Sequence, residues 1–331
     1  MGNFLGEKHT VGFKPQTAAG TPETTVTHFL VSEGLDMYAH PTSIPRKSSL
    51  GTGAELPSRC GWIMPGGKVP IEINASQPQP FYWLLGHVVT TQPAVSTDPT
   101  VYLHTITDDA LAVSKQNASD SVNLTAEGNR VFDQTKQGDV KLNKIVLHVV
   151  PGEIGRLELE WSALTHTDDA TLTSEPTFLT DVIDCKSVAV KFDGSPDLTV
   201  TSADVTIDVG HEQLPTLVAG GAGHPQVIRR KDRLDVTGNL SWLDYPAAQL
   251  AKFIAATTFA LIIELQGDTI SNAYKKFLRI TLPACQYTGG LEPSIAAGVI
   301  TGDAAFKAFY DTTTGLQVKV EAQNTIVAIN T

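Results

Sequence analysis

Pairs of adjacent carboxylates are the first residues in the sequence that could do acid–base chemistry. Asp108-Asp109 and Asp168-Asp169 are two such pairs. A glycosidase needs two carboxyl groups that oppose each other across a cleft, whereas neighbours on an irregular segment point apart. We therefore interpret both pairs as solvated turn residues.

Histidine and glycine motifs give no stronger sign of a reactive site. His211-Glu212 could begin a zinc-protease helix, but position 215, where the second His is needed, is Pro215. The Gly-rich segment 219–224 lacks the Lys-Ser/Thr ending of a phosphate-binding loop. The other histidines show no ligand spacing. We expect no catalytic residue, no metal, no cofactor and no enzymatic activity.

Composition and charge narrow the class of protein. The 331 residues include 24 Lys and Arg against 35 Asp and Glu, a net charge of −11, which argues against sequence-specific binding of duplex DNA. A hydrophobic share of 41% is too high for a disordered chain. Cys60, Cys185 and Cys285 are too far apart in sequence for a metal or redox motif, which predicts free thiols. Neither a secretory leader nor a membrane-spanning stretch is recognised, so we expect folding in a cytoplasm.

Alternating strands and two short helices form the expected framework. Segments such as 68–74, 144–150, 156–161 and 203–209 alternate apolar and polar residues, as half-buried strands do. Pro80–Val89 and Pro246–Ala256 each open on a proline and are predicted as helices. Residues 108–139 are polar and rich in turn residues. Two Gly/Pro-rich segments, 40–67 and 210–231, are predicted as long loops.

The order of these elements repeats at an offset near 165 residues, with Lys68 aligned on Arg233 and Leu85 on Leu250. Each copy has a long loop, an alternating strand, a proline-opened helix, further strands and a hairpin. We therefore predict a mainly β fold with two tandem domains, each a β-sandwich or barrel with one short α-helix, related by internal duplication. The predicted boundaries are an N-terminal arm at 1–24, a first domain at 25–165 and a second at 166–331.

The duplicated pattern resembles the tail tube (major tail) proteins of long-tailed bacteriophages, in their double-domain form. The carrying residues are loop 40–67 with KVPIEIN and PFYWLLGHVV, loop 210–231 with RLDVTGN and PAAQLAKFIAA, and segment 181–209. The resemblance implies a structural virion protein of the tail. Three subunits would form a pseudo-sixfold ring, with six subunits as the alternative, and rings would stack into a hollow tube that passes double-stranded DNA without specific binding. Tape-measure, tail-tip and terminator proteins are the other implied partners.

The resemblance also assigns roles to individual residues. The long loops and the arm would join stacked rings, and acidic strand residues would face the lumen. The candidate ring-stacking residues are Ile44, Leu50, Leu56, Trp62, Ile63, Leu214, Leu217 and Val218. The candidate lumen-facing acids are Glu72, Glu158, Glu160 and Asp235.

Two other functions fit a β-rich acidic chain. A two-domain phage or surface adhesin could bind carbohydrate on exposed tryptophans and loop carboxylates, and a β-rich hydrolase is a third reading. Trp83 and Trp161 lie in apolar periodic segments, which favours packing in the core or at a subunit interface over a sugar platform.

Overall fold

The structure is a computed structural model of the chain. It describes residues 9–49, 55–92, 100–108, 122–130, 133–173, 182–183, 185–214, 225–231, 233–244, 246–271, 274–290, 294–296 and 299–329. Nineteen strands of these ranges form one network of antiparallel pairs, two more form a separate ribbon, and two α-helices accompany them. The predicted mainly β fold with two short helices is confirmed.

Six adjacent strands form the central sheet, in the order β4, β9, β8, β13, β16, β20. One row across it pairs Val69 with Leu159, Ile145, Ile207 and Val236, all buried. Alternation therefore turns one face of the sheet into the core. The strands are β4 (Glu55–Glu72), β9 (Arg156–Ser162), β8 (Asp133–Val149), β13 (Val200–Asp208), β16 (Asp235–Trp242) and β20 (Val299–Ala308).

Two smaller groups of strands flank this sheet and share one pairing pattern. In the first, β1 pairs with β2 and β7, and β8 pairs with β7 and β10; in the second, β11 pairs with β12 and β17, and β18 pairs with β17 and β21. The first group is β1 (His9–Pro15), β2 (His28–Leu30), β7 (Leu124–Arg130) and β10 (Thr165–Thr167). The second is β11 (Val188–Phe192), β12 (Ser195–Asp197), β17 (Phe259–Ser271), β18 (Tyr274–Gly290) and β21 (Lys319–Asn324).

The two groups share even their irregular registers. Leu124 pairs with Val140 and Ala126 with Gln137, so one residue of β8 is skipped. Phe259 pairs with Cys285 and Leu261 with Leu282, with the same skip on β18. Bulges at matching places are specific features of a sheet rather than chance.

A glycine opposite an aromatic residue fixes the correspondence between the halves. Gly67 of β4 pairs with Trp161, and Gly238 of β16 pairs with Phe306. Gly67 therefore corresponds to Gly238, 171 residues further on. The sequence alignment of Lys68 with Arg233 was wrong by six residues, because low identity left the register of these strands undetermined.

The two helices follow β4 and β16, as predicted. α1 (Gln79–Leu85) has Pro80 in its first turn and ends at Gly86, whose φ of 85° closes the helix in the left-handed region. Its Phe81 and Trp83 are buried, whereas α2 (Ala247–Ile254) leaves Ile254 75% exposed. The hairpin of β5 (Gly86–Thr91) and β6 (Tyr102–Asp108) follows α1 and pairs with β21.

The two segments predicted as long loops are largely β-hairpins, and this prediction was wrong. β3 (Asp36–Ser49) pairs along β4, and β14 (His211–Leu214) pairs with β15 (Val227–Arg230). Residues 215–224 and 50–54 lie outside the described residues. Proline was read as a loop signal, but a strand with an unpaired edge tolerates it, and the β3–β4 register shifts next to Pro41 and near Arg46.

Other boundaries differ from the sequence prediction as well. The supposed turn-rich segment 108–139 contains β7 and the start of β8. Part of the predicted arm is β1, which pairs along β7 and buries Val11 and Phe13 completely. The boundary expected at 165/166 falls inside β10.

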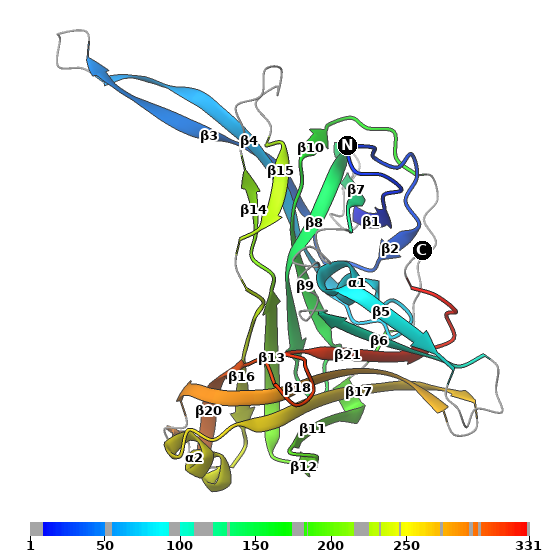
Figure 1. Ribbon diagram of the computed structural model, residues 1–331, viewed down its shortest axis with the longest axis vertical. Coiled ribbons are helices and arrows are strands. Elements are labelled where there is room, and N and C mark those ends of the chain that lie inside the picture. The colour runs from blue at the N-terminus through cyan, green and yellow to red at the C-terminus, as the bar shows by residue number, and fades with distance from the viewer. Residues whose placement is uncertain are drawn as a thin grey trace, which may run out of the picture.

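The hairpins and the second helix lie at opposite ends of the molecule (Figure 1). Figure 1 shows β3–β4 projecting from the body, with β14–β15 directed to the same end, whereas α2, β11 and β12 lie at the far end. Trp83, Trp161 and Trp242 are each 1% exposed and belong to the core. No helix in the described ranges is long and apolar enough to cross a bilayer.

Candidate functional site

The non-core face of the central sheet, with its extension on β3, carries rows of polar side chains. We call it the polar face. Asp208 of β13 pairs with Lys144 on one side and Asp235 on the other, which continues the row across both halves. Its charged and aromatic members include Asp36, Tyr38, Lys68, Glu72, Lys144, His148, Arg156, Glu158, Glu160, Asp204, Asp208, Asp235, Asp303 and Lys307.

Among these named residues, carboxylates outnumber Lys and Arg by eight to four. Lys68 Nζ lies 2.7 Å from Glu158 Oε1, and Lys307 bonds Asp235. The hydrogen bond to Glu158 raises the pKa of Lys68. Burial, together with the charges of Glu160 and Asp36, raises the pKa of Tyr38, as expected on a negative surface.

All four predicted lumen-facing acids lie on the polar face. Glu72 of β4 is opposite Arg156 of β9. Glu158 and Glu160 lie two and four residues after Arg156 and therefore share its face. Asp235 is opposite Asp208. The sequence prediction did not name Asp204 or Asp208, although alternation along 204–208 places both on the face of Thr206. It also missed the basic residues that share the face.

Five of the eight predicted stacking residues lie on the strands of the two hairpins. Trp62 and Ile63 of β4 are partly exposed, with Ile63 opposite Pro41, and Leu214 ends β14 and is partly exposed. Ile44 and Leu56 are on β3 and β4, but their side chains lie outside the described residues. Leu50, Leu217 and Val218 are outside the described ranges altogether.

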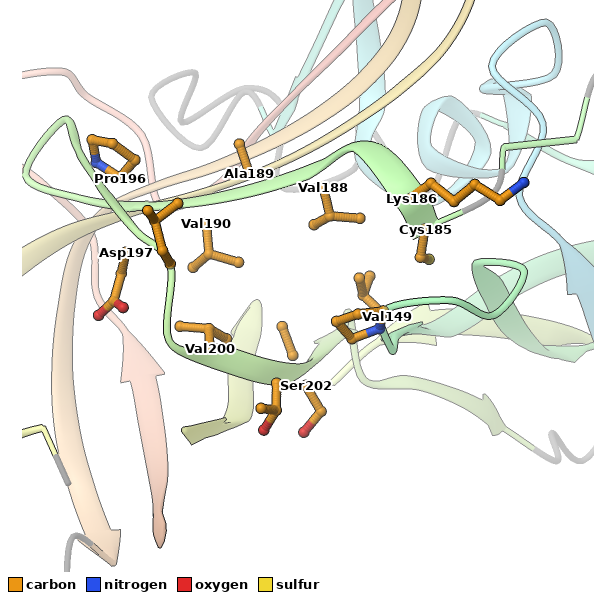
Figure 2. Close-up of a pocket in the computed structure, with 14 residues that line it drawn as sticks. Val149, Cys185, Lys186, Val188, Ala189, Val190, Pro196, Asp197, Val200 and Ser202 are labelled. Carbon is orange, nitrogen blue, oxygen red and sulfur yellow. The ribbon is translucent and has the colours of Figure 1, made fainter. Parts of the chain in front are cut away.

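A small cavity of about 250 Å³ between β11 and β13 offers no reactive constellation. Figure 2 shows Val190 above Val200 and Val188 nearer Val149, with Lys186 directed away. Its carboxylate, Asp197, is held by the Thr199 hydroxyl and by Trp242 Nε1. Within the ranges that the structure describes, no group of three or more His, Cys, Asp or Glu could hold a metal ion.

The most informative feature of the site is the joint between the two halves. β8 of the first half pairs with β13 of the second over six residues, from Lys144–Asp208 to Val149–Ala203. The polar face is therefore continuous, and neither strand ends as an open edge there.

Comparison with known proteins agrees with this architecture. The family model described as phage tail tube protein matches residues 6–313. The chain belongs to the phage tail tube protein family. No curated protein sequence matches it. A chain of this tail tube family is a structural component of the phage virion, and self-assembly into a tube follows from that family.

Proposed function

We propose that this tail tube protein forms rings of three subunits that stack into a hollow tube. Each subunit supplies two similar units, so that the ring has pseudo-sixfold symmetry; six subunits per ring is the alternative. The recurring strand pairing, joined edge to edge by β8 and β13, carries the proposal. The recurring pairing fits two units per chain. The first is approximately residues 25–165 together with strand β1, and the second is residues 166–331.

We further propose that the polar face lines the lumen and that double-stranded DNA passes along it. DNA is a dense polyanion, and proteins bind it by neutralising its phosphates with Lys and Arg. A wall on which carboxylates exceed basic groups repels phosphate and supplies few such contacts. Glu72, Glu158, Glu160 and Asp235 are thus proposed lumen residues without a binding role.

The projecting hairpins are the proposed contacts between rings. They extend to one end of the molecule, beyond the body of the sheet (Figure 1). Partly exposed Trp62 and Ile63 suit an interface that becomes buried on assembly. Tape-measure, tail-tip and terminator proteins would meet the tube at its interior and its two ends, in a tail assembled in the host bacterial cytoplasm.

The carbohydrate-binding alternative has little support from the described residues, because Trp83, Trp161 and Trp242 are in the core and only Trp62 is partly exposed. Negative-stain microscopy of the concentrated protein tests the proposal. Rings or hollow tubes with a threefold repeat of subunits are expected. Subunits that stay monomeric at every concentration, or that bind glycans as monomers, would contradict it.

A further inference from the structure

A buried glutamine of the first half stands where the second half has a leucine. Next to the skip in β8, Gln137 faces Ala126, and next to the matching skip in β18, Leu282 faces Leu261. Gln137 therefore corresponds to Leu282. Both residues are fully buried, so the core of one half contains an amide at a place that the core of the other half fills with hydrocarbon.

The amide has two polar neighbours, and these have apolar counterparts as well. Trp161 Nε1 donates to Gln137 Oε1 at 2.7 Å, and Gln137 Nε2 lies 3.0 Å from Nδ1 of His166, its partner on β10. In the second half, extending the register of β18 and β21 by one residue places Val318 opposite Leu282. We call the three polar side chains the glutamine cluster. Gln137, Trp161 and His166 correspond to Leu282, Phe306 and Val318, each of which is at most 1% exposed.

The hydrogen-bonding capacity of its neighbours fixes the orientation of the amide. An indole N–H can only donate, so Gln137 Oε1 faces Trp161 and the NH2 group faces away from the indole. Nδ1 of His166 is then an acceptor, and the imidazole proton is on Nε2, 2.8 Å from Asp168 Oδ1. Every polar atom of the three side chains therefore has a partner.

The NH2 group also contacts the base of the β3–β4 hairpin. It donates to the carbonyls of Gly66 at 2.9 Å and Tyr38 at 3.2 Å, two residues that face each other on β4 and β3. Gly66 is the last residue of β4 in register with β9. Beyond it the Pro65 carbonyl still accepts from Ala163 N–H, and the rest of β4 pairs with β3 alone among the described strands. The amide thus lies where the hairpin leaves the sheet (Figure 1).

The corresponding level of the second half is supported by strands instead. Gly66 and Tyr38 correspond to Thr237 and Thr206, which also face each other. Thr206 belongs to β13, which pairs with β16 on one edge and with β8 on the other. Within the described residues β3 pairs only with β4. The buried amide therefore occurs in the half whose hairpin has no strand on its second side.

We propose that the glutamine cluster positions the base of the β3–β4 hairpin in the dissociated subunit, so that the hairpin is already oriented when rings stack. The inference rests on the proposed stacking role of this hairpin and adds what orients it. A buried hydrogen-bonded network contributes little net stability over a well-packed apolar core, but a fully satisfied network specifies one arrangement. Such preorganisation favours association, because less conformational freedom is lost when the contact forms.

A triple variant that gives the first half the residues of the second tests the proposal: Gln137→Leu, Trp161→Phe and His166→Val. Because the second half already packs this set, the urea midpoint of dissociated subunits should be unchanged or higher. Backbone amides of 36–40 and 61–67 should exchange with deuterium about tenfold faster in dissociated variant subunits. Tubes should then need a protein concentration about tenfold higher to form.

Two further variants separate the hairpin contact from the loss of a buried polar group. Gln323→Leu is the matched control, since Gln323 is 8% exposed and its amide donates to the Lys275 carbonyl at 2.7 Å, away from the hairpin. His166→Val alone leaves both N–H groups of Gln137 for the two strand carbonyls. Both variants should keep the slow exchange at 36–40 and the tube formation of the unmodified protein.

The outcomes that would overturn the proposal are distinct. Folded triple-variant subunits with unchanged exchange at 36–40 and 61–67 would show that the cluster only fills the core, and a triple variant that does not fold would show that it holds the core rather than the hairpin. Faster exchange with tubes at the usual concentration would remove the link to stacking. Unmodified protein that never forms tubes would overturn the proposed function alone, because exchange in dissociated subunits does not depend on assembly.

Discussion

At the scale of single residues, close cross-strand packing explains why two glycines hold matching positions. A Cβ on Gly67 would collide with the Trp161 ring, and one on Gly238 would collide with the Asp204 carbonyl and, at 2.5 Å, with the Phe306 ring. In each half the aromatic ring lies over the glycine of the neighbouring strand. Aromatic cover of a strand glycine pins the register.

Gly238→Ala should destabilise the folded subunit by about 1–3 kcal/mol, because the neighbouring backbone carbonyl cannot move aside without disturbing β13. Urea unfolding of dissociated subunits measures the effect. Gly267→Ala is the control, since its new Cβ would meet other atoms only at 3.5 Å or more. Equal loss in both variants would show that the aromatic pairing does not matter.

A buried histidine gives the subunit a pH-dependent stability. His104 is fully buried, its Nδ1 lies 2.9 Å from the Thr90 hydroxyl, and its Nε2 lies 3.0 Å from Asn324 Oδ1. Burial lowers the pKa of His104 below its usual value of 6.5. The unfolded chain therefore takes up this proton first as the pH falls.

The free energy of unfolding should therefore decrease as the pH falls below about 6.5 toward the lowered pKa of the folded state. Denaturant unfolding of dissociated subunits at several pH values between 7.5 and 5 measures this slope. His104→Gln cannot take up the proton, so its slope over the same range should be shallower than that of the unmodified chain. Identical slopes would show that another group is responsible.

At the scale of elements, alternation and proline-opened helices were readable from the sequence, whereas pairing partners were not. β9, β13, the second half of β8 and the starts of both helices were predicted close to their observed positions because period and capping are local. The strand at Asp36–Ser49 and the part of Glu55–Glu72 before Lys68 were missed, since their prolines are compatible with a strand only when one edge is unpaired. That condition depends on the rest of the fold. The sequence could not decide which sheet face carries the four acids, because a shift of one residue in strand register moves every side chain to the opposite face.

Trp62→Ala should weaken the stacking of rings while leaving subunits folded and rings intact. A buried interface tryptophan commonly contributes about 2 kcal/mol, or roughly 30-fold in association. Tube length in electron micrographs and the concentration at which tubes form give the measurement. Val89→Ala on β5, which removes another partly exposed apolar side chain, is the matched control. Normal tubes from the Trp62 variant would remove the β3–β4 hairpin from the stacking contact.

At the scale of the whole molecule, one pairing pattern used twice accounts for most of the chain. The β5–β6 hairpin interrupts the first copy after α1, which is why matching residues are 171 apart at Gly67 and Gly238 but only 145 apart at Trp161 and Phe306. The single offset of 165 found in the sequence lies between these two structural offsets. The same hairpin pairs with β21 of the second copy and ties the halves together a second time.

The charge of the polar face should determine whether assembled tubes bind double-stranded DNA. Glu158→Lys with Glu160→Lys raises the net charge by four per chain on one strand of this face and should make tubes retain double-stranded DNA. Retention should fall steeply with added salt, because binding would depend on released counterions.

Asp244→Lys with Asp268→Lys makes the same charge change at exposed positions outside the polar face. A filter-binding or gel assay with short duplexes, small enough to enter a tube, compares the two variants with the unmodified protein. Stronger retention by the first variant alone supports a lumen lined by this face, whereas equal retention by both would place the face elsewhere in the assembly.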